Sequence, residues 1–148
     1  MRLTTFTDYS LRVLMFVAIA PEGRATIGEV ARSFGISEHH LVKVVHALGK
    51  AGLLDNARGR GGGLRLAMPA ASIRVGQVVR ATEGGDFPAE CFEPHSSSCA
   101  IVRVCRLKNV LAEAMDAFYK VLDRYTIADL VSNRTKLAAI LHFHTAPA

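Results

Sequence analysis

The chain has 148 residues, 50% of them hydrophobic, and a formal net charge of +5; this length allows one compact domain with an oligomerisation segment and excludes a multidomain enzyme. The longest apolar stretch, residues 11–21, is interrupted by Arg12 and is too short to cross a bilayer, and no leader with a cleavage site opens the chain. We therefore expect a soluble, cytoplasmic protein with no membrane contact.

The positive charge is concentrated in the first half of the chain. Residues 1–80 carry 11 Lys and Arg against 5 Asp and Glu, whereas residues 81–148 carry 7 against 8. A basic half of this kind favours a polyanionic partner, and the elements that follow indicate double-stranded DNA.

The first predicted helix begins at a threonine cap, Thr5 or Thr7, and ends before Pro21. Apolar residues recur along it at helical spacing, so we expect it to contribute to the core. Asp8 lies in its first turn, where a carboxylate interacts favourably with the helix dipole.

Residues 26–52 predict two short helices joined by a tight turn. Thr26 and Glu29 form a capping box at the start of the first helix, and residues 35–37 make the turn. Two short helices joined through a glycine-containing turn are typical of a helix-turn-helix motif.

The second of these helices carries the candidate DNA contacts. Ser37 is expected to cap it, and the polar side chains of its first turns face outward. In a helix-turn-helix motif these N-terminal residues contact base edges in the major groove. The candidates are Ser37, His39, His40 and Lys43.

A β-hairpin with a basic tip is predicted over residues 53–66. Two short apolar runs flank a glycine-rich segment that contains Arg58 and Arg60. Glycine lets the backbone approach a phosphate closely, and arginine is suited to a narrow, electronegative minor groove. The hairpin is therefore predicted to be the wing of a winged helix, with Arg58 and Arg60 as further DNA contacts.

The second half predicts an arm rather than another domain. A helix is expected from Ser72 to about residue 84, then a loop, then a long helix from about Val102 with an apolar stripe. Some 20 helical residues span about 30 Å, which is longer than a helix needs to be to pack against a small winged-helix domain. We interpret this element as a dimerisation helix of a homodimer.

The predicted fold class is thus mainly α, with three parts. Residues 1–84 are expected to form the winged helix-turn-helix DNA-binding domain, residues 85–105 a cysteine-bearing cluster loop, and residues 106–148 the dimerisation helix and the C-terminal tail. Thr126 is expected to cap a final short helix in the last part.

Three cysteines lie close together: Cys91, Cys99 and Cys105 are separated by seven and five residues. An odd, crowded set fits a thiolate-bound metal in a reducing cytosol better than a disulfide framework. The wide gaps differ from the paired spacing of zinc ribbons and favour an iron-sulfur cluster. Zinc completed by His95 or a carboxylate, and free thiols, are the alternatives.

Several of these segments together resemble the winged-helix iron-sulfur transcriptional regulators, the family that includes NsrR, IscR and RirA. The resemblance covers nearly the whole chain, and it is strongest to the nitric-oxide-sensing repressors of the family. It rests on residues 1–9, the helix-turn-helix, the wing at residues 58–66, the three cysteines and residues 122–130.

The resemblance implies a 4Fe-4S cluster, or alternatively a 2Fe-2S cluster, held by the three cysteines. It also implies that Asp8 supplies the fourth ligand from the partner subunit, and that nitric oxide is the signal that releases an operator. Lys108 stands where the cluster-supply regulators of the family carry a histidine ligand, which disfavours that role.

Other functions remain open on the residues alone. Residues 89–93 resemble those of the RirA-type iron sensors, so an iron-responsive repressor is the main alternative. A zinc-stabilised DNA-binding protein and a small cluster hydratase are less well supported, because DNA-reading and dimer elements leave little chain for a substrate pocket.

Overall fold

The structure is a computed structural model that describes residues 2–57, 62–84, 89–92 and 99–141. It confirms the predicted mainly α fold. The α-helices are α1 (Thr5–Ile19), α2 (Ile27–Phe34), α3 (Glu38–Lys50), α4 (Val75–Thr82), α5 (Arg106–Leu122), α6 (Ile127–Leu130) and α7 (Arg134–Ile140). The remaining elements are the strands β1 (Leu54–Ala57) and β2 (Gly63–Leu66) and the 3-10 turns η1 (Pro21–Gly23), η2 (Ala70–Ser72) and η3 (Glu90–Phe92).

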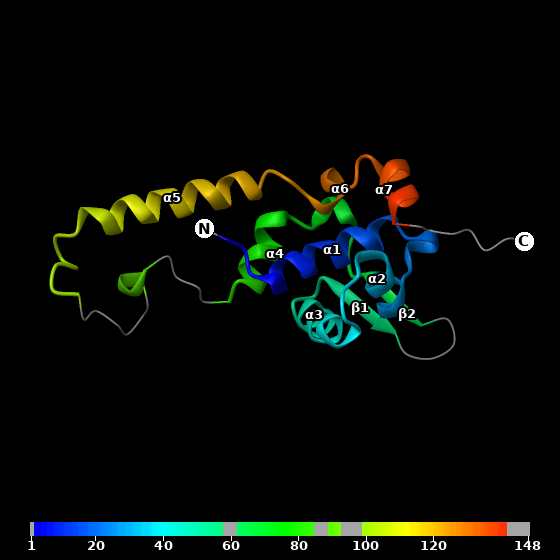
Figure 1. Cartoon of the computed structure of the whole chain (residues 1–148). Coiled ribbons are helices and arrows are strands. Elements are labelled where there is room, and N and C mark those ends of the chain that lie inside the picture. The colour runs from blue at the N-terminus through cyan, green and yellow to red at the C-terminus, as the bar shows by residue number, and fades with distance from the viewer. Residues whose placement is uncertain (1, 58–61, 85–88, 93–98, 142–148) are drawn as a thin grey trace, which may run out of the picture.

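One hydrophobic core joins the helix-turn-helix to residues that follow the long helix. Helix α1 lies in the middle of the body, with α3 and the hairpin on one side and α4, α6 and α7 on the other (Figure 1). Fully buried side chains come from α1, α3, α4 and α6: Val13, Leu14, Leu41, Leu48, Val78 and Ile127. The chain therefore leaves the body after α4, forms α5 and returns to the same core.

Local capping determines where the first helices begin. The side chain of Thr4 accepts a hydrogen bond from the Thr7 amide, so Thr4, and not Thr5 or Thr7, caps α1. The predicted capping box of Thr26 and Glu29 is confirmed at the start of α2. Ser37 occupies the predicted N-cap position of α3, but its side chain makes no capping hydrogen bond.

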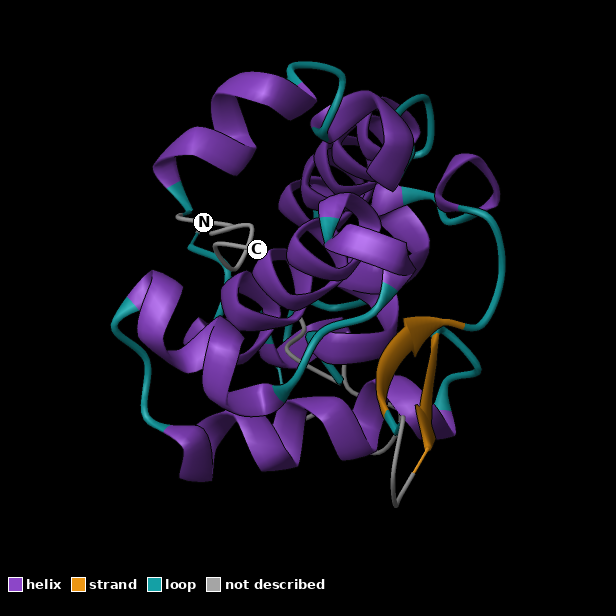
Figure 2. Ribbon diagram, turned by 90° about the vertical axis from the view of Figure 1, so that its right-hand side faces the viewer, coloured by secondary structure: helices purple, strands orange, loops and turns teal. Residues whose placement is uncertain are grey.

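The hairpin is a two-stranded antiparallel sheet in which Leu54 pairs with Leu66 and Ala57 with Gly63. It packs beside α3, as Figure 2 shows. Gly63 has φ 139°, and a Cβ there would overlap the Ala25 carbonyl oxygen. Ala25 bridges to Leu64 in the same sheet, so glycine allows the sheet to contact the turn before α2. The predicted wing contacts Arg58 and Arg60 lie outside the described residues.

Helix α5 stands apart from the body along much of its length (Figure 1). None of its residues is buried. It begins at Arg106, with Cys105 at the N-cap, four residues later than Val102, the predicted start. Helix α4 likewise begins at Val75, because Ser72 belongs to η2. Helix α7 was not predicted, since only its contact with the body distinguishes it from a polar tail.

Two exposed stripes run along α5. The apolar seam consists of exposed residues at alternating spacings of three and four: Leu107, Val110, Ala114, Ala117 and Val121. The polar stripe beside it consists of Arg106, Asn109, Glu113, Asp116 and Lys120. The helical spacing in the sequence predicts a dimer stripe of Leu107, Leu111, Ala114, Phe118, Leu122 and Tyr125. In the structure, Phe118 and Leu122 are half-buried.

Among the described residues, no helix is both long and apolar enough to cross a membrane.

Candidate DNA-binding surface and cysteine site

The outward face of α3 gathers the predicted DNA contacts. Ser37, His39, His40 and Lys43 are all exposed, while the opposite face of the helix is buried in the core. The His39 and His40 rings lie 6.2 Å apart between centroids. The helix therefore presents a polar surface next to the hairpin, as a reading helix requires.

Val42 belongs to the same surface, although sequence reasoning did not include it among the candidate contacts. Its side chain is 53% exposed between polar neighbours. Its position three residues after His39 and four before His46 was a signal that it lies on the outward face. An exposed apolar side chain on a reading helix is suited to contact a thymine methyl group.

Asp8 lies at the surface in the first turn of α1. Its carboxylate pairs with Arg12 one turn later, with Arg12 Nη2 and Asp8 Oδ2 2.8 Å apart, and 45% of the Asp8 side chain is exposed. The carboxylate is thus oriented by its own helix and accessible to a group outside the body.

A polar network joins the start of α1 to the end of α4. Glu83 Oε1 accepts hydrogen bonds from the Thr4 amide at 2.8 Å and the Thr4 hydroxyl at 3.1 Å. The hydroxyls of Thr7 and Thr82 are 2.8 Å apart. This network therefore ties the helix that carries Asp8 to the end of α4, two residues before the predicted cluster loop.

The three cysteines are free thiols, with Cys91 and Cys105 half-buried and Cys99 exposed. Cys91 lies in η3, and Cys105 is the N-cap of α5. Lys108 Nζ lies 5.7 Å from the centroid of the Phe92 ring, so η3 contacts the first turn of α5. The structure thus places the segments of Cys91 and Cys105 next to each other.

The cysteines and Asp8 are not assembled into one metal centre in this single chain. Among the residues that the structure describes, no three His, Cys, Asp or Glu side chains come together as a metal-binding group. His95, the alternative zinc ligand, lies outside the described residues. The donor chemistry fits an iron-sulfur cluster, because the three cysteines form no disulfide and cysteine sulfur is the usual ligand of such clusters.

Three carboxyl groups in the described part of the chain have a pKa below the ordinary value. A hydrogen bond with Arg80 lowers the pKa of Asp123 below 3.8, and one with Thr126 lowers that of Asp129 below 3.8. For Glu83, burial raises the pKa, but hydrogen bonds from Thr7 and Thr4 outweigh it and bring the net pKa below 4.5.

These shifts predict acid sensitivity. A carboxylate with a lowered pKa in the folded state stabilises the fold above its unfolded pKa, and this stabilisation is lost as pH falls through the folded value. We expect the unfolding temperature to decrease as the pH is lowered below about 5. The Asp129→Asn variant should unfold at a lower temperature than wild type at pH 7, and its unfolding temperature should decrease less in acid, as measured by circular dichroism. An equal decrease in the variant and in wild type would contradict this prediction.

The reading helix, the adjacent hairpin and the arm define a winged-helix DNA-binding regulator of transcription. The chain belongs to the Rrf2 family, described as iron-dependent transcriptional regulators, which it matches over residues 3–133. Regulators of this family bind DNA. The predicted family and class are therefore confirmed.

The chain is similar to curated transcriptional regulators over nearly its whole length. The HTH-type transcriptional regulator NsrR of Geobacillus kaustophilus is 48% identical over 142 residues, 95% of this chain and 97% of the relative. NsrR of Bacillus subtilis is 46% identical, with the same coverage. These relatives are regulators and not enzymes.

Solved structures share the fold. IscR of T. potens superposes with a TM-score of 0.71 at 27% identity, covering 90% of this chain and 88% of that one. CymR, the global cysteine regulator of B. subtilis, gives a TM-score of 0.70 at 28% identity, covering 89% of this chain and 97% of that one.

Proposed function

We propose that this protein is a cytoplasmic, homodimeric repressor that holds an iron-sulfur cluster and releases its operator in response to nitric oxide. The observation that carries the proposal is the set of three free cysteines in a chain that is 48% identical to a regulator named NsrR. A 4Fe-4S cluster suits the donor set best, because three thiolates and one carboxylate give one ligand for each iron. A 2Fe-2S cluster is the alternative.

Cys91, Cys99 and Cys105 would hold the cluster, with Asp8 of the partner subunit as the fourth ligand. A bound cluster supplies iron that reacts with nitric oxide, most readily where the ligand is not a thiolate. The exposed Asp8 carboxylate is oriented by Arg12, and its helix is hydrogen-bonded to Glu83 at the end of α4. Asp8 is thus in a position to link the loop of one subunit to the DNA-binding body of the other.

Release of Asp8 can reach the DNA-reading surface through α1. Asp8 lies in the first turn of α1, the helix that packs against α3 in the core. A small rotation of α1 therefore moves the reading helix with it. A tenfold loss of operator affinity requires only about 1.4 kcal/mol.

The dimer is proposed to form through the apolar seam of α5. Apolar residues at alternating spacings of three and four are typical of helices that pair side by side. Leu107 is 63% exposed, Val110 59% and Val121 44%, so the seam lacks cover in the single chain. A second copy of the same helix supplies a matching apolar surface. The chain then has the three parts proposed from the sequence. Residues 1–84 bind DNA, residues 85–105 hold the cluster, and residues 106–148 contain the dimerisation helix and the C-terminal tail.

The DNA contacts are proposed to be Ser37, His39, His40 and Lys43 from α3 and Arg58 and Arg60 from the wing. The α3 residues lie on one exposed face. Each copy in the dimer would place this face in one major groove of a roughly palindromic operator.

Lys43→Ala should weaken operator binding by about tenfold and reduce the salt slope of log affinity by about 1, because one positive charge that neutralises the DNA is removed from the interface. Fluorescence anisotropy across a salt series measures both quantities. The matched control is Lys50→Ala at the end of the same helix, which should leave the slope nearly unchanged. An unaltered slope for Lys43→Ala would place Lys43 outside the interface.

The decisive experiment is an anaerobic titration of the purified protein with nitric oxide, following cluster absorbance and operator binding in the same samples. Loss of absorbance at a few nitric oxide molecules per cluster with parallel DNA release supports the proposal. Retention of DNA until iron is chelated would support the iron-responsive repressor instead. A colourless protein with stoichiometric zinc would support a zinc-stabilised DNA-binding protein.

A further inference from the structure

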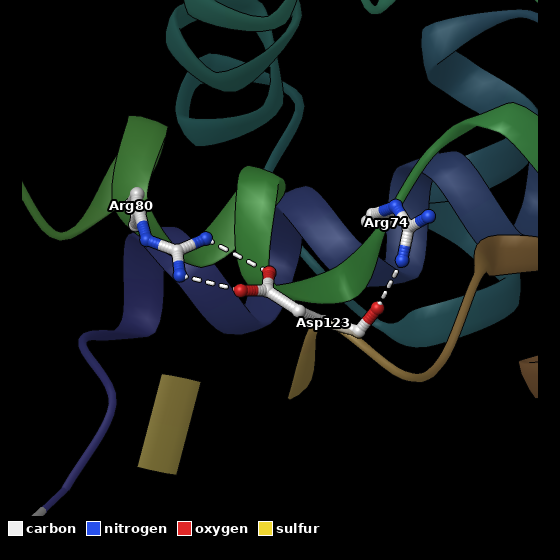
Figure 3. A network of polar contacts seen from close by, with 3 residues as sticks. All are labelled: Arg74, Arg80 and Asp123. Carbon is white, nitrogen blue, oxygen red and sulfur yellow. Dashed lines mark hydrogen bonds and ion pairs between the residues drawn. The ribbon is translucent and has the colours of Figure 1, made fainter. Parts of the chain in front are cut away.

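Three hydrogen bonds to Asp123 hold the C-terminal end of α5: its side chain accepts two of them and its backbone carbonyl accepts the third. Asp123, the C-cap residue of α5, accepts hydrogen bonds from Arg80 Nη1 at 2.8 Å and Arg80 Nη2 at 2.6 Å, a bidentate geometry. Its carbonyl oxygen accepts a third hydrogen bond from Arg74 Nη1 at 2.6 Å. Figure 3 shows both arginines converging on this one residue from α4 and its N-cap.

The surroundings of Asp123 leave little room for another arrangement. A Cβ at Gly76 would overlap the Asp123 carboxylate, so α4 and the end of α5 approach as closely as a glycine permits. The Arg80 guanidinium also lies over the Tyr119 ring, 4.4 Å from its centroid. We call Arg74, Gly76, Arg80 and Asp123 the Asp123 clamp.

The clamp lies where α5 joins the body. The N-terminal end of α5 stands away from the body (Figure 1), and no residue of α5 is buried. The direction of α5 relative to the reading helix therefore depends on contacts at its C-terminal end.

A small change of this direction has a large effect at the far end. With 17 residues, α5 is about 25 Å long, and a rotation of about 10° moves its tip by about 4 Å. One base pair of DNA advances about 3.4 Å along the axis. A rotation of this size changes the separation of the two reading helices by about one base pair or more.

We propose that the Asp123 clamp determines the half-site spacing that the dimer accepts in its operator. This inference rests on the proposed dimerisation through α5, and Arg80 and Asp123 act in it as positioning residues. The clamp residues belong to α4, its N-cap and the C-cap of α5, and none is among the proposed DNA contacts, so their effect on DNA is expected through the direction of α5.

The clamp orients α5 and contributes little to the stability of the fold. The Arg80 and Asp123 side chains are 48% and 34% exposed, and exposed ion pairs contribute little to stability. The chain after α5 is also attached independently, because the Val75 amide donates to the Tyr125 carbonyl at 2.9 Å and Ile127 is fully buried. Loss of the clamp should therefore leave a folded protein with a less defined arm.

The test compares binding to DNA duplexes of different half-site spacing. An operator selected by the wild-type protein from random DNA is remade with one or two base pairs added to or removed from its centre. Wild-type, Asp123→Asn and Gly76→Ala proteins, purified anaerobically, are titrated on each duplex. Gly76→Ala keeps every charge and displaces the carboxylate by overlap alone, and Asp116→Asn on the polar stripe of α5 is the control.

We expect wild type and Asp116→Asn to prefer one spacing by at least tenfold, and both clamp variants to reduce this preference to less than threefold or to move it to another spacing. Sedimentation should show that every variant remains a dimer. An unchanged preference in both variants, or an equal loss of affinity at every spacing, would overturn the proposal. A monomeric wild-type protein would overturn the proposed dimer and the clamp together, and sedimentation identifies that outcome separately.

Discussion

Cys105→Ser is expected to lose iron on anaerobic purification and to weaken operator binding by at least about 100-fold. A hydroxyl is a far poorer ligand for iron than a thiolate, and loss even of a group supporting a ligand costs about 10–100-fold in metal affinity. Operator binding should then approach non-specific binding, which is at least about 1,000-fold weaker than specific binding for most regulators. Iron analysis, absorbance and anisotropy on one sample measure these effects.

This substitution separates ligation from folding. Cys105 is the N-cap of α5 but makes no capping hydrogen bond, and serine is among the preferred N-cap residues. Cys105→Ser should therefore preserve or strengthen the start of the helix, and its circular dichroism spectrum should match that of wild-type protein from which iron has been chelated. A variant that retains a full complement of iron would show that Cys105 is not a ligand.

Ala117→Glu is expected to convert the protein to a monomer and to lower operator affinity by about 1,000-fold, to the level of non-specific binding. Ala117 lies in the apolar seam and is exposed in the single chain. In a symmetric pair of α5 helices the new carboxylate meets apolar residues of the other copy, and burying an unpaired charge is costly. Sedimentation equilibrium measures the mass, and anisotropy the affinity.

Asn109→Glu is the matched control, because it adds the same charge to the polar stripe of the same helix. It should remain dimeric and bind DNA as wild type does. If Ala117→Glu is also dimeric, the seam is not the interface and another surface joins the two copies.

Local signals made the helix-turn-helix and the wing predictable. The capping box of Thr26 and Glu29 appears where the sequence indicated it, and a second one at Thr126 and Asp129 begins α6. Both depend on residues three apart in the chain. The paired strands also follow from a short glycine-rich segment between apolar runs.

Features that depend on distant contacts were not predictable in the same way. The Asp123 clamp joins residues more than 40 positions apart, and nothing near Asp123 in the sequence indicates Arg80 as its partner. The seam of α5 was also only partly assigned: the helical spacing selected Leu107 and Ala114, but not Val110, Ala117 and Val121. Only the placement of α5 shows which of its two apolar stripes lacks cover.

The arrangement of the cysteines in space also could not be predicted from the sequence. Spacing indicates which thiols are available, but it does not bring Cys91 or Cys99 to Cys105. In the proposed site, one ligand comes from another copy of the chain. The geometry of the complete donor set is therefore a property of the pair of subunits.

The return of the chain to the core after α5 has a consequence for biosynthesis. Ile127 is fully buried, and Leu141 is nearly so, against residues from the first third of the protein. These contacts span more than 100 positions, so the native packing of this core closes only after Leu141 has left the ribosome. Cys91, Cys99 and Cys105 all precede Leu141 in the chain, so all three thiols leave the ribosome before the core can close.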